Sequence, residues 1–99
     1  MRRLTTPTHT FTLPFDETVV KKFLLTYVQN DEKILEKTEQ EVLVEGNVWS
    51  VVLTQEETKK FKPGMAQAQI RVLTDDDKAL ASDVFQFGVK QVFNEVVLE

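Results

Sequence analysis

A hairpin pattern constrains the fold of this chain more than any other sequence feature. Residues 42–53 place two β-rich arms on either side of Gly46-Asn47, a pair suited to the positive backbone angles of a tight turn. With that turn, one face of the hairpin is uniformly apolar; it comprises Val42, Val44, Trp49, Val51 and Leu53. An antiparallel sheet with one side on a core has this pattern. The hairpin therefore indicates a small all-β domain.

Other alternating segments predict the remaining strands. His9, Phe11 and Leu13 share one side of a first strand that ends at Pro14. Three further strands are expected at residues 33–38, 65–73 and 79–90. The first follows a turn at Asn30-Asp31 and is charged, as suits a sheet edge, and the last follows a turn at Asp75–Asp77. Residues 19–30 fit an amphipathic helix as well as a strand, and their β-branched and aromatic content favours the strand.

One helical crossover is expected between strands. Thr54 and Glu57 have the spacing of a capping box, and Pro63-Gly64 ends the segment. We therefore predict a short helix over residues 55–61, with Phe61 anchored on the core. Several short strands with one such crossover predict a sandwich of two antiparallel sheets, and 99 residues suffice for a single domain, 1–99.

The two ends of the chain differ in character. Residues 1–7 are polar and are expected to form a flexible leader, whereas residues 91–99 form an apolar C-terminal segment that also fits a helical stripe. Such a segment either packs back on the domain or meets a partner. The candidate partner-binding residues are Val92, Phe93, Val96, Val97 and Leu98, together with a polar row on one strand, Gln67, Gln69 and Arg71. An ordinary outer sheet face is the plainer interpretation of that row.

Composition argues against several classes of function. The net charge of −4 does not suit phosphate-backbone binding, so no nucleic-acid partner is expected. No apolar run approaches the length of a membrane span, and the amino terminus lacks the apolar middle of a signal peptide, so we expect a soluble, intracellularly made protein. The chain has no Cys and one His, which excludes thiol nucleophiles, Cys-based zinc sites and two-histidine metal sites within the chain.

Individual chemical candidates favour structural interpretations. Asp75–Asp77 lacks the ligand spacing of a calcium loop and suits a solvated turn. His9 has no identifiable nucleophile and shares a strand face with Phe11. Four acidic residues among lysines suit a solvated face rather than a hydrolytic pair; they are Glu36, Glu39, Glu41 and Glu45. We therefore predict no enzyme, no catalytic or metal-binding residue and no cofactor.

Three segments together resemble a known family. They are Thr5–Phe15, Leu53–Thr58 with Phe61, and Gln69–Thr74 continuing to Ala79–Asp83. In combination they resemble small, uncharacterised proteins encoded in the tail and baseplate gene regions of prophages in Gram-positive bacteria. The resemblance covers residues 5–98 and implies an immunoglobulin-like β-sandwich, similar to the N-terminal domain of phage baseplate upper proteins. It carries over no catalytic or metal-binding residue, and the segment 91–98 departs most from the family pattern.

The resemblance implies a structural role. We expect a non-enzymatic interaction module of the phage tail or baseplate, present in the host cytoplasm during assembly, with other phage structural proteins or a second copy of itself as partner. Contact through an exposed strand edge or the segment 91–99 would need no specialised pocket. The alternative is a carbohydrate-binding module that aids adhesion to a cell wall. Because sugar binding needs exposed rings, the positions of Trp49 and Tyr27 discriminate between the two functions.

Overall fold

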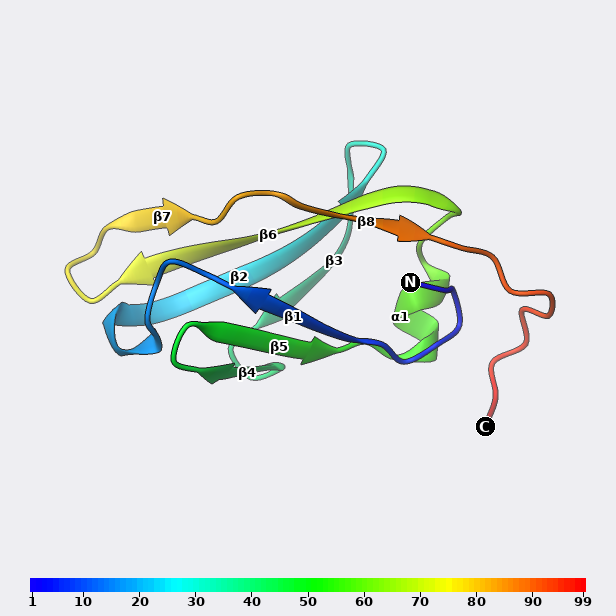
Figure 1. Ribbon diagram of the computed structural model, residues 1–99, viewed down its shortest axis with the longest axis horizontal. Coiled ribbons are helices and arrows are strands. Elements are labelled where there is room, and N and C mark those ends of the chain that lie inside the picture. Colours follow the sequence, from blue (N-terminus) through cyan, green and yellow to red (C-terminus); the bar gives the residue numbers. More distant parts are fainter.

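Two antiparallel β-sheets face each other in the computed structural model, which describes residues 1–99 (Figure 1). The small sheet has the strand order β1-β5-β4, and the large sheet has the order β3-β2-β6, with β7 and β8 both paired to β6. This arrangement confirms the predicted all-β sandwich. The elements are β1 (Thr8–Thr12), the 3-10 turn η1 (Glu17–Val19), β2 (Val20–Gln29), β3 (Glu32–Thr38), β4 (Val42–Glu45), β5 (Val48–Val52), α1 (Gln55–Lys59), β6 (Gly64–Thr74), β7 (Ala79–Ala81) and β8 (Phe85–Val89).

The hairpin of β4 and β5 has the predicted register. Val44 lies opposite Trp49 and Glu45 opposite Val48, so the two-residue turn falls on Gly46 and Asn47. Gly46 has φ +62°, a left-handed angle that glycine adopts without steric penalty. The predicted apolar face is turned toward the core, whereas Leu43 on the other face is exposed. Local turn chemistry and alternation together produced this element.

The ambiguous segment at residues 19–30 is strand β2, at the centre of the large sheet. It pairs with β3 on one side and β6 on the other. Its inward-facing Leu25 and Tyr27 are fully buried, while Leu24 and Thr26 on the other face are only half-buried. A period of two therefore decides which residues are buried, because both neighbours of this strand are strands.

The turn between β2 and β3 also agrees with the sequence analysis. Asn30 and Asp31 both take positive φ angles, 54° and 63°, which these two residue types tolerate better than most others. Strand β3 lies at the edge of the large sheet, as its charges predict.

The last long strand predicted over 79–90 is wrong in one respect, because the chain forms two separate strands there. The hydroxyl oxygen of Ser82 accepts a hydrogen bond of 3.0 Å from the backbone N–H of Ile70, and Ser82 Oγ donates to the carbonyl of Asp83. A side chain thus replaces a backbone group in the ladder and ends β7. Strand β8 resumes at Phe85.

Helix α1 begins as predicted and ends earlier than predicted. Thr54 and Glu57 form the complete capping box, with Glu57 N–H donating to Thr54 Oγ1 over 3.1 Å and Thr54 N–H donating to Glu57 Oε1 over 2.9 Å. The helix ends at Lys59 rather than residue 61. Pro63 disfavours helical angles at the residue before it, and Phe61 is fully buried in the core as expected.

Lys37 is an unexpected buried charge on the edge strand. Its side chain is almost fully buried and pairs with Glu57 of α1 and Glu41, so an ion pair joins β3 to the helix. Burial opposes the charged form of Lys37, but hydrogen bonds to Glu57 and Glu41 outweigh it and raise the pKa of the lysine. Alternation predicts only that residue 37 faces inward; the two carboxylates allow a lysine to be there.

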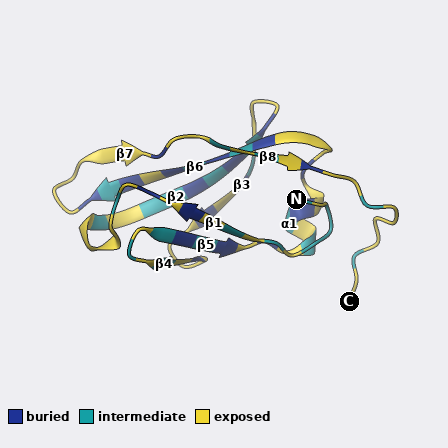
Figure 2. Ribbon diagram, in the orientation of Figure 1, coloured by how far each residue is buried: buried dark blue, intermediate teal, exposed yellow.

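The core lies between the sheets and contains 15 buried hydrophobic residues, with Trp49, Tyr27 and Phe61 the largest (Figure 2). Hydrogen bonds hold residues 1–7, the expected flexible leader, on this sandwich. Arg3 N–H donates to the Lys90 carbonyl over 3.0 Å, and Thr5 exchanges two hydrogen bonds with the buried hydroxyl of Thr58. The leader therefore connects α1 to the end of β8.

Candidate interaction surfaces

Residues 91–99 follow β8, form no helix or strand, and turn back beside α1 and the N-terminus (Figure 1). The helical alternative for this segment is therefore wrong. The Gln55 side chain holds its far end: Gln55 Nε2 donates to the Leu98 carbonyl over 2.8 Å, and Leu98 N–H donates to Gln55 Oε1 over 2.9 Å. Because the side-chain amide binds only backbone atoms, this contact fixes the chain path without using the Leu98 side chain.

Arg3 holds the middle of the same segment. Its guanidinium donates to the carbonyls of Lys59 and Phe61, at the end of α1, over 3.0 Å and 2.7 Å. Its remaining Nη1 pairs with the carboxylate of Glu95. The carbonyls at the end of α1 thus orient a cation toward the segment. The Asn94 side chain accepts from Val96 N–H over 3.1 Å and shapes the bend. Polar contacts determine the path of residues 91–99.

The apolar side chains of this segment remain largely outside the core. Phe93 is fully exposed, Val96 and Leu98 are mostly exposed, and Val92 and Val97 are half-buried. An apolar hollow of about 370 Å³ lies next to them, lined by Leu4, Val92, Asn94, Val96 and Leu98. A cluster of exposed apolar residues, unlike a single one, is typical of a surface that meets another molecule.

Sequence reasoning singled out the apolar residues but missed those that position them. Arg3 is 92 positions from Glu95 and Gln55 is 43 positions from Leu98, and only the fold brings these residues and Leu4 to the segment. The sequence contains one weak signal, a basic Arg2-Arg3 pair that is matched in charge by Glu95. Nothing local marks Gln55 as a backbone clamp.

The second predicted group, Gln67, Gln69 and Arg71, lies on the outer face of the large sheet and not near the segment 91–99. These residues lie opposite Val28, Thr26 and Leu24 of β2 respectively. Gln69 is already engaged, because its Nε2 donates to the Ser82 carbonyl over 2.9 Å. A hollow of about 160 Å³ beside this row is lined by Thr26, Val28, Gln67, Ala68, Gln69 and Val84. The row is a mixed polar face, and Arg71 is its exposed end.

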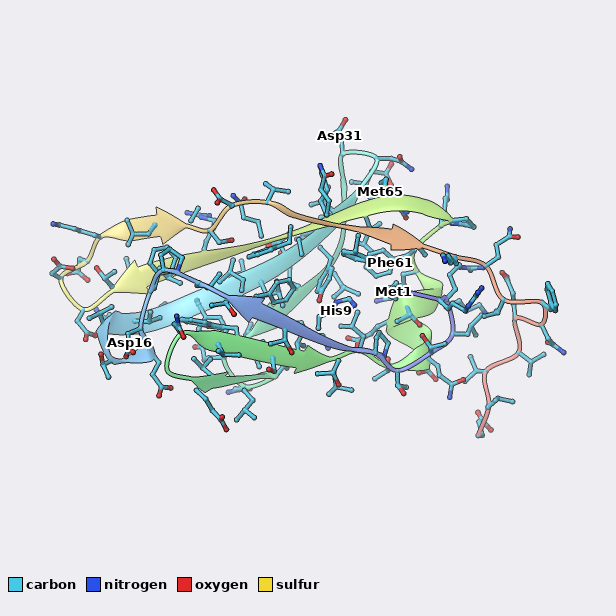
Figure 3. All side chains as sticks on the ribbon, in the orientation of Figure 1. Met1, His9, Asp16, Asp31, Phe61 and Met65 are labelled. Carbon is cyan, nitrogen blue, oxygen red and sulfur yellow. The ribbon has the colours of Figure 1, made fainter.

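His9 belongs to an aromatic cluster between the sheets. Its Nδ1 shares a 2.6 Å hydrogen bond with the hydroxyl of Tyr27, and its ring packs against Phe11, Tyr27 and Phe87. Figure 3 places His9 near Phe61 and Met1, whereas Asp16 and Asp31 lie far from it. Burial, and secondarily the Met1 ammonium group, lower the pKa of His9, and burial followed by the Glu57 charge raises the pKa of Tyr27. No Ser, Thr or Lys side chain is hydrogen-bonded to His9.

Neither of the two rings considered for carbohydrate binding is exposed. Trp49 and Tyr27 are both completely buried. The indole N–H of Trp49 has no hydrogen-bond partner, although Trp49 borders an open hollow of about 200 Å³. Glu17 and Glu39 line this hollow beside Lys21 and Lys22, so charges of both signs surround it. Sugar platforms need exposed ring faces, which these two residues do not provide.

The acidic candidates form ordinary turns and ion pairs. Asp76 contacts Thr74 and Lys78, and Asp77 pairs with Lys21, in the turn before β7. Glu36 and Glu41 pair with Lys33 and Lys37 respectively. No three His, Asp or Glu side chains are grouped closely enough to hold a metal ion.

Comparison with protein-family models, with curated proteins and with solved structures finds no match to this chain. The chain also contains no helix whose length and apolarity would allow it to span a membrane.

Proposed function

We propose that this protein is a non-enzymatic interaction module that serves as a component or accessory of a phage tail or baseplate. The observation that carries the docking role is the exposed apolar group on residues 91–99, of which Phe93 is the most exposed member. The phage context is supported by the resemblance of three sequence segments, Thr5–Phe15, Leu53–Thr58 and Gln69–Thr74, to prophage tail-region proteins. The same resemblance supports an immunoglobulin-like arrangement of the sandwich.

The contacts around residues 91–99 are consistent with such a role. Backbone atoms of the segment are bound by Gln55, and the Glu95 carboxylate by Arg3, which leaves the apolar side chains free for a partner. A partner that covers Phe93 removes apolar surface from water without reorganising the core. Other phage structural proteins and a second copy of the chain are the proposed partners.

Mass spectrometry of purified phage particles tests this function. Induction of the prophage followed by density purification should yield particles that contain this polypeptide in a constant ratio to the known tail proteins. A strain that carries the Phe93→Ser substitution tests the docking surface itself, because the fold does not bury that side chain. Reduced incorporation of the variant is the expected result. Absence of the wild-type polypeptide from particles, together with normal tail assembly after its deletion, would contradict the proposal.

A further inference from the structure

Strand β1 is an edge of the small sheet and is paired on one side only, with β5. Alternate residues of an antiparallel strand direct their backbone N–H and C=O groups to the same neighbour. Leu53 N–H donates to the Pro7 carbonyl over 3.0 Å. Leu13 N–H donates to the Asn47 carbonyl over 2.9 Å, so the odd-numbered residues of β1 face β5. The even-numbered residues direct their backbone groups away from the sheet; they are Thr8, Thr10 and Thr12.

These outward backbone groups have no partner within the chain. No backbone hydrogen bond outside the regular elements reaches the three threonines, β5 is the only strand paired with β1, and all three residues are exposed. Donors and acceptors that alternate along an extended edge are matched by another β-strand, which adds main-chain hydrogen bonds without a specialised pocket. The chemistry of this edge therefore specifies an extended segment as its occupant.

Strand β1 also lacks the features that protect the other sheet edges from strand addition. Four of the seven residues of β3 are charged, and the short strand β4 lies between Glu41 and the charge of its own last residue, Glu45. Residues 1–3 cover the end of β8, because the Met1 ammonium group donates to the Gly88 carbonyl over 2.8 Å. Strand β1 has no charged residue, no proline, no bulge and no covering segment.

We propose that β1 of a second copy pairs with this edge in antiparallel orientation, on a two-fold axis that passes between the two Thr10 residues. In this register Thr10 lies opposite its own counterpart, and Thr8 lies opposite Thr12 of the other copy. Each threonine then exchanges both of its backbone hydrogen bonds with a threonine of the other copy. A second copy satisfies every outward group of β1 because these groups are distributed symmetrically about Thr10, and the two-fold contact closes as a dimer.

Charge and side chains favour the same occupant. The chain has a net charge of −4, which opposes contact between copies, but residues 4–15 contain no Asp, Glu, Lys or Arg. On the outer face threonines lie opposite threonines, a favourable cross-strand pair. On the inward face His9 lies opposite Phe11 of the other copy, and the half-buried rings of Phe87 and Phe85 pack on these two side chains. Aromatic contacts therefore accompany the backbone hydrogen bonds.

Sedimentation equilibrium of the full chain tests the inference. The paired strand is five residues long, so the interface is small and the dimer is expected to be reversible. Over roughly 10 µM to 1 mM, which spans weak dissociation constants, the mass should rise from the monomer value of 11.4 kDa toward twice that value. Thr10→Pro removes the central N–H of each copy at a position where a sheet edge tolerates proline, and should weaken association about tenfold or more.

A charge exchange at Thr10 tests the position of the axis. Thr10→Lys and Thr10→Glu each place two like charges opposite each other across the axis, so each variant alone should associate about threefold or more weakly than the wild type. An equimolar mixture should regain association, because the lysine of one variant then lies opposite the glutamate of the other. Leu43→Lys and Leu43→Glu are the matched controls. Leu43 lies in one row with Ser50 and Thr10 across the outer face, at the far edge of the same sheet, and its variants should associate like the wild type.

Four results would overturn the pairing of β1. They are a wild-type chain that stays monomeric over the whole range, a mixture of the two Thr10 variants that associates no better than each alone, equal loss in the Leu43 controls, and self-association that is lost on removal of residues 92–99 instead. Circular dichroism spectra that match the wild type establish that each variant is folded. The inference goes beyond the proposed function and fails separately from it: a monomer that is nevertheless incorporated in phage particles refutes the dimer alone.

Discussion

Trp49→Ala is expected to lower the free energy of unfolding by about 3 kcal/mol. Trp49 is 0% exposed, and its ring meets Phe23 edge-on with the ring centroids 6.3 Å apart. A buried tryptophan removes roughly 150–250 Å² from water, which corresponds to roughly 4–6 kcal/mol at about 25 cal/mol per Å². This transfer term is the upper limit of the effect only if the surroundings relax to fill the space, because a residual cavity adds to the loss.

Two features of the site reduce that limit. The buried indole N–H has no partner, so its removal relieves a desolvation penalty of roughly 1–3 kcal/mol. The hollow of about 200 Å³ beside the ring is bordered by Phe23 and Val44, which gives the surroundings space to relax after truncation. The difference between the two terms is about 3 kcal/mol, at the lower end of the roughly 3–5 kcal/mol typical of such truncations.

Urea titration followed by far-ultraviolet circular dichroism measures the effect without the lost tryptophan fluorescence. A loss of this size should lower the midpoint by about 1–3 M urea and the Tm by about 12–24 °C. Leu43→Ala in the same hairpin is the control; Leu43 is 64% exposed, and the change should stay below about 0.5 kcal/mol. Trp49→Phe, which keeps an aromatic ring and removes the unpaired N–H, should lose at most about 1 kcal/mol. A loss below about 1 kcal/mol for Trp49→Ala, or one equal to the control, would refute the core role of this ring.

Two further perturbations test the aromatic cluster and the segment 91–99. Burial lowers the pKa of His9 in the folded chain, so the unfolded chain binds the proton more readily. The contribution of neutral His9 to stability should therefore be fully present above its ordinary pKa of 6.5 and should decline as the pH falls below that value. His9→Phe should flatten the decline of stability between pH 6.5 and 4.5. Below pH 4.5 Glu57 and Glu41, whose pKa values are lowered, also contribute to the loss of stability. An unchanged slope of Tm against pH in thermal unfolding scans would contradict this assignment. Removal of residues 92–99 should change the free energy of unfolding by less than about 1 kcal/mol, since the core contains none of these residues. The same truncation should abolish incorporation of the polypeptide into phage particles, measured by mass spectrometry. A truncated chain that is melted, or that is incorporated like the full chain, would count against the separation of folding from docking.

Local rules were sufficient for most elements of the fold. Gly46 determines the hairpin turn because only a residue without Cβ takes its positive φ freely, and the capping box at Thr54 determines where α1 begins. Strict alternation on β6 correctly placed Ala66, Ala68 and Ile70 in the core. These features involve residues a few positions apart, so the sequence alone specifies them.

The errors arose where partners distant in sequence decide the outcome. The strand predicted over 79–90 is divided because the Ser82 hydroxyl bonds to Ile70, a residue twelve positions away. Lys37 is buried because α1 brings the Glu57 carboxylate to it. No periodicity describes either contact, since each depends on how the two sheets and the helix pack.

For the candidate docking surface, the sequence by itself determined that residues 91–99 are apolar and that no constellation of catalytic residue types is present nearby. Only the tertiary structure decided that Gln55 binds the backbone of this segment and that Arg3 binds the Glu95 carboxylate. These contacts leave Phe93 in solvent and an apolar hollow beside its neighbours. The physical reason is that hydrophobicity is a property of each side chain, whereas its burial depends on which other parts of the chain are within reach.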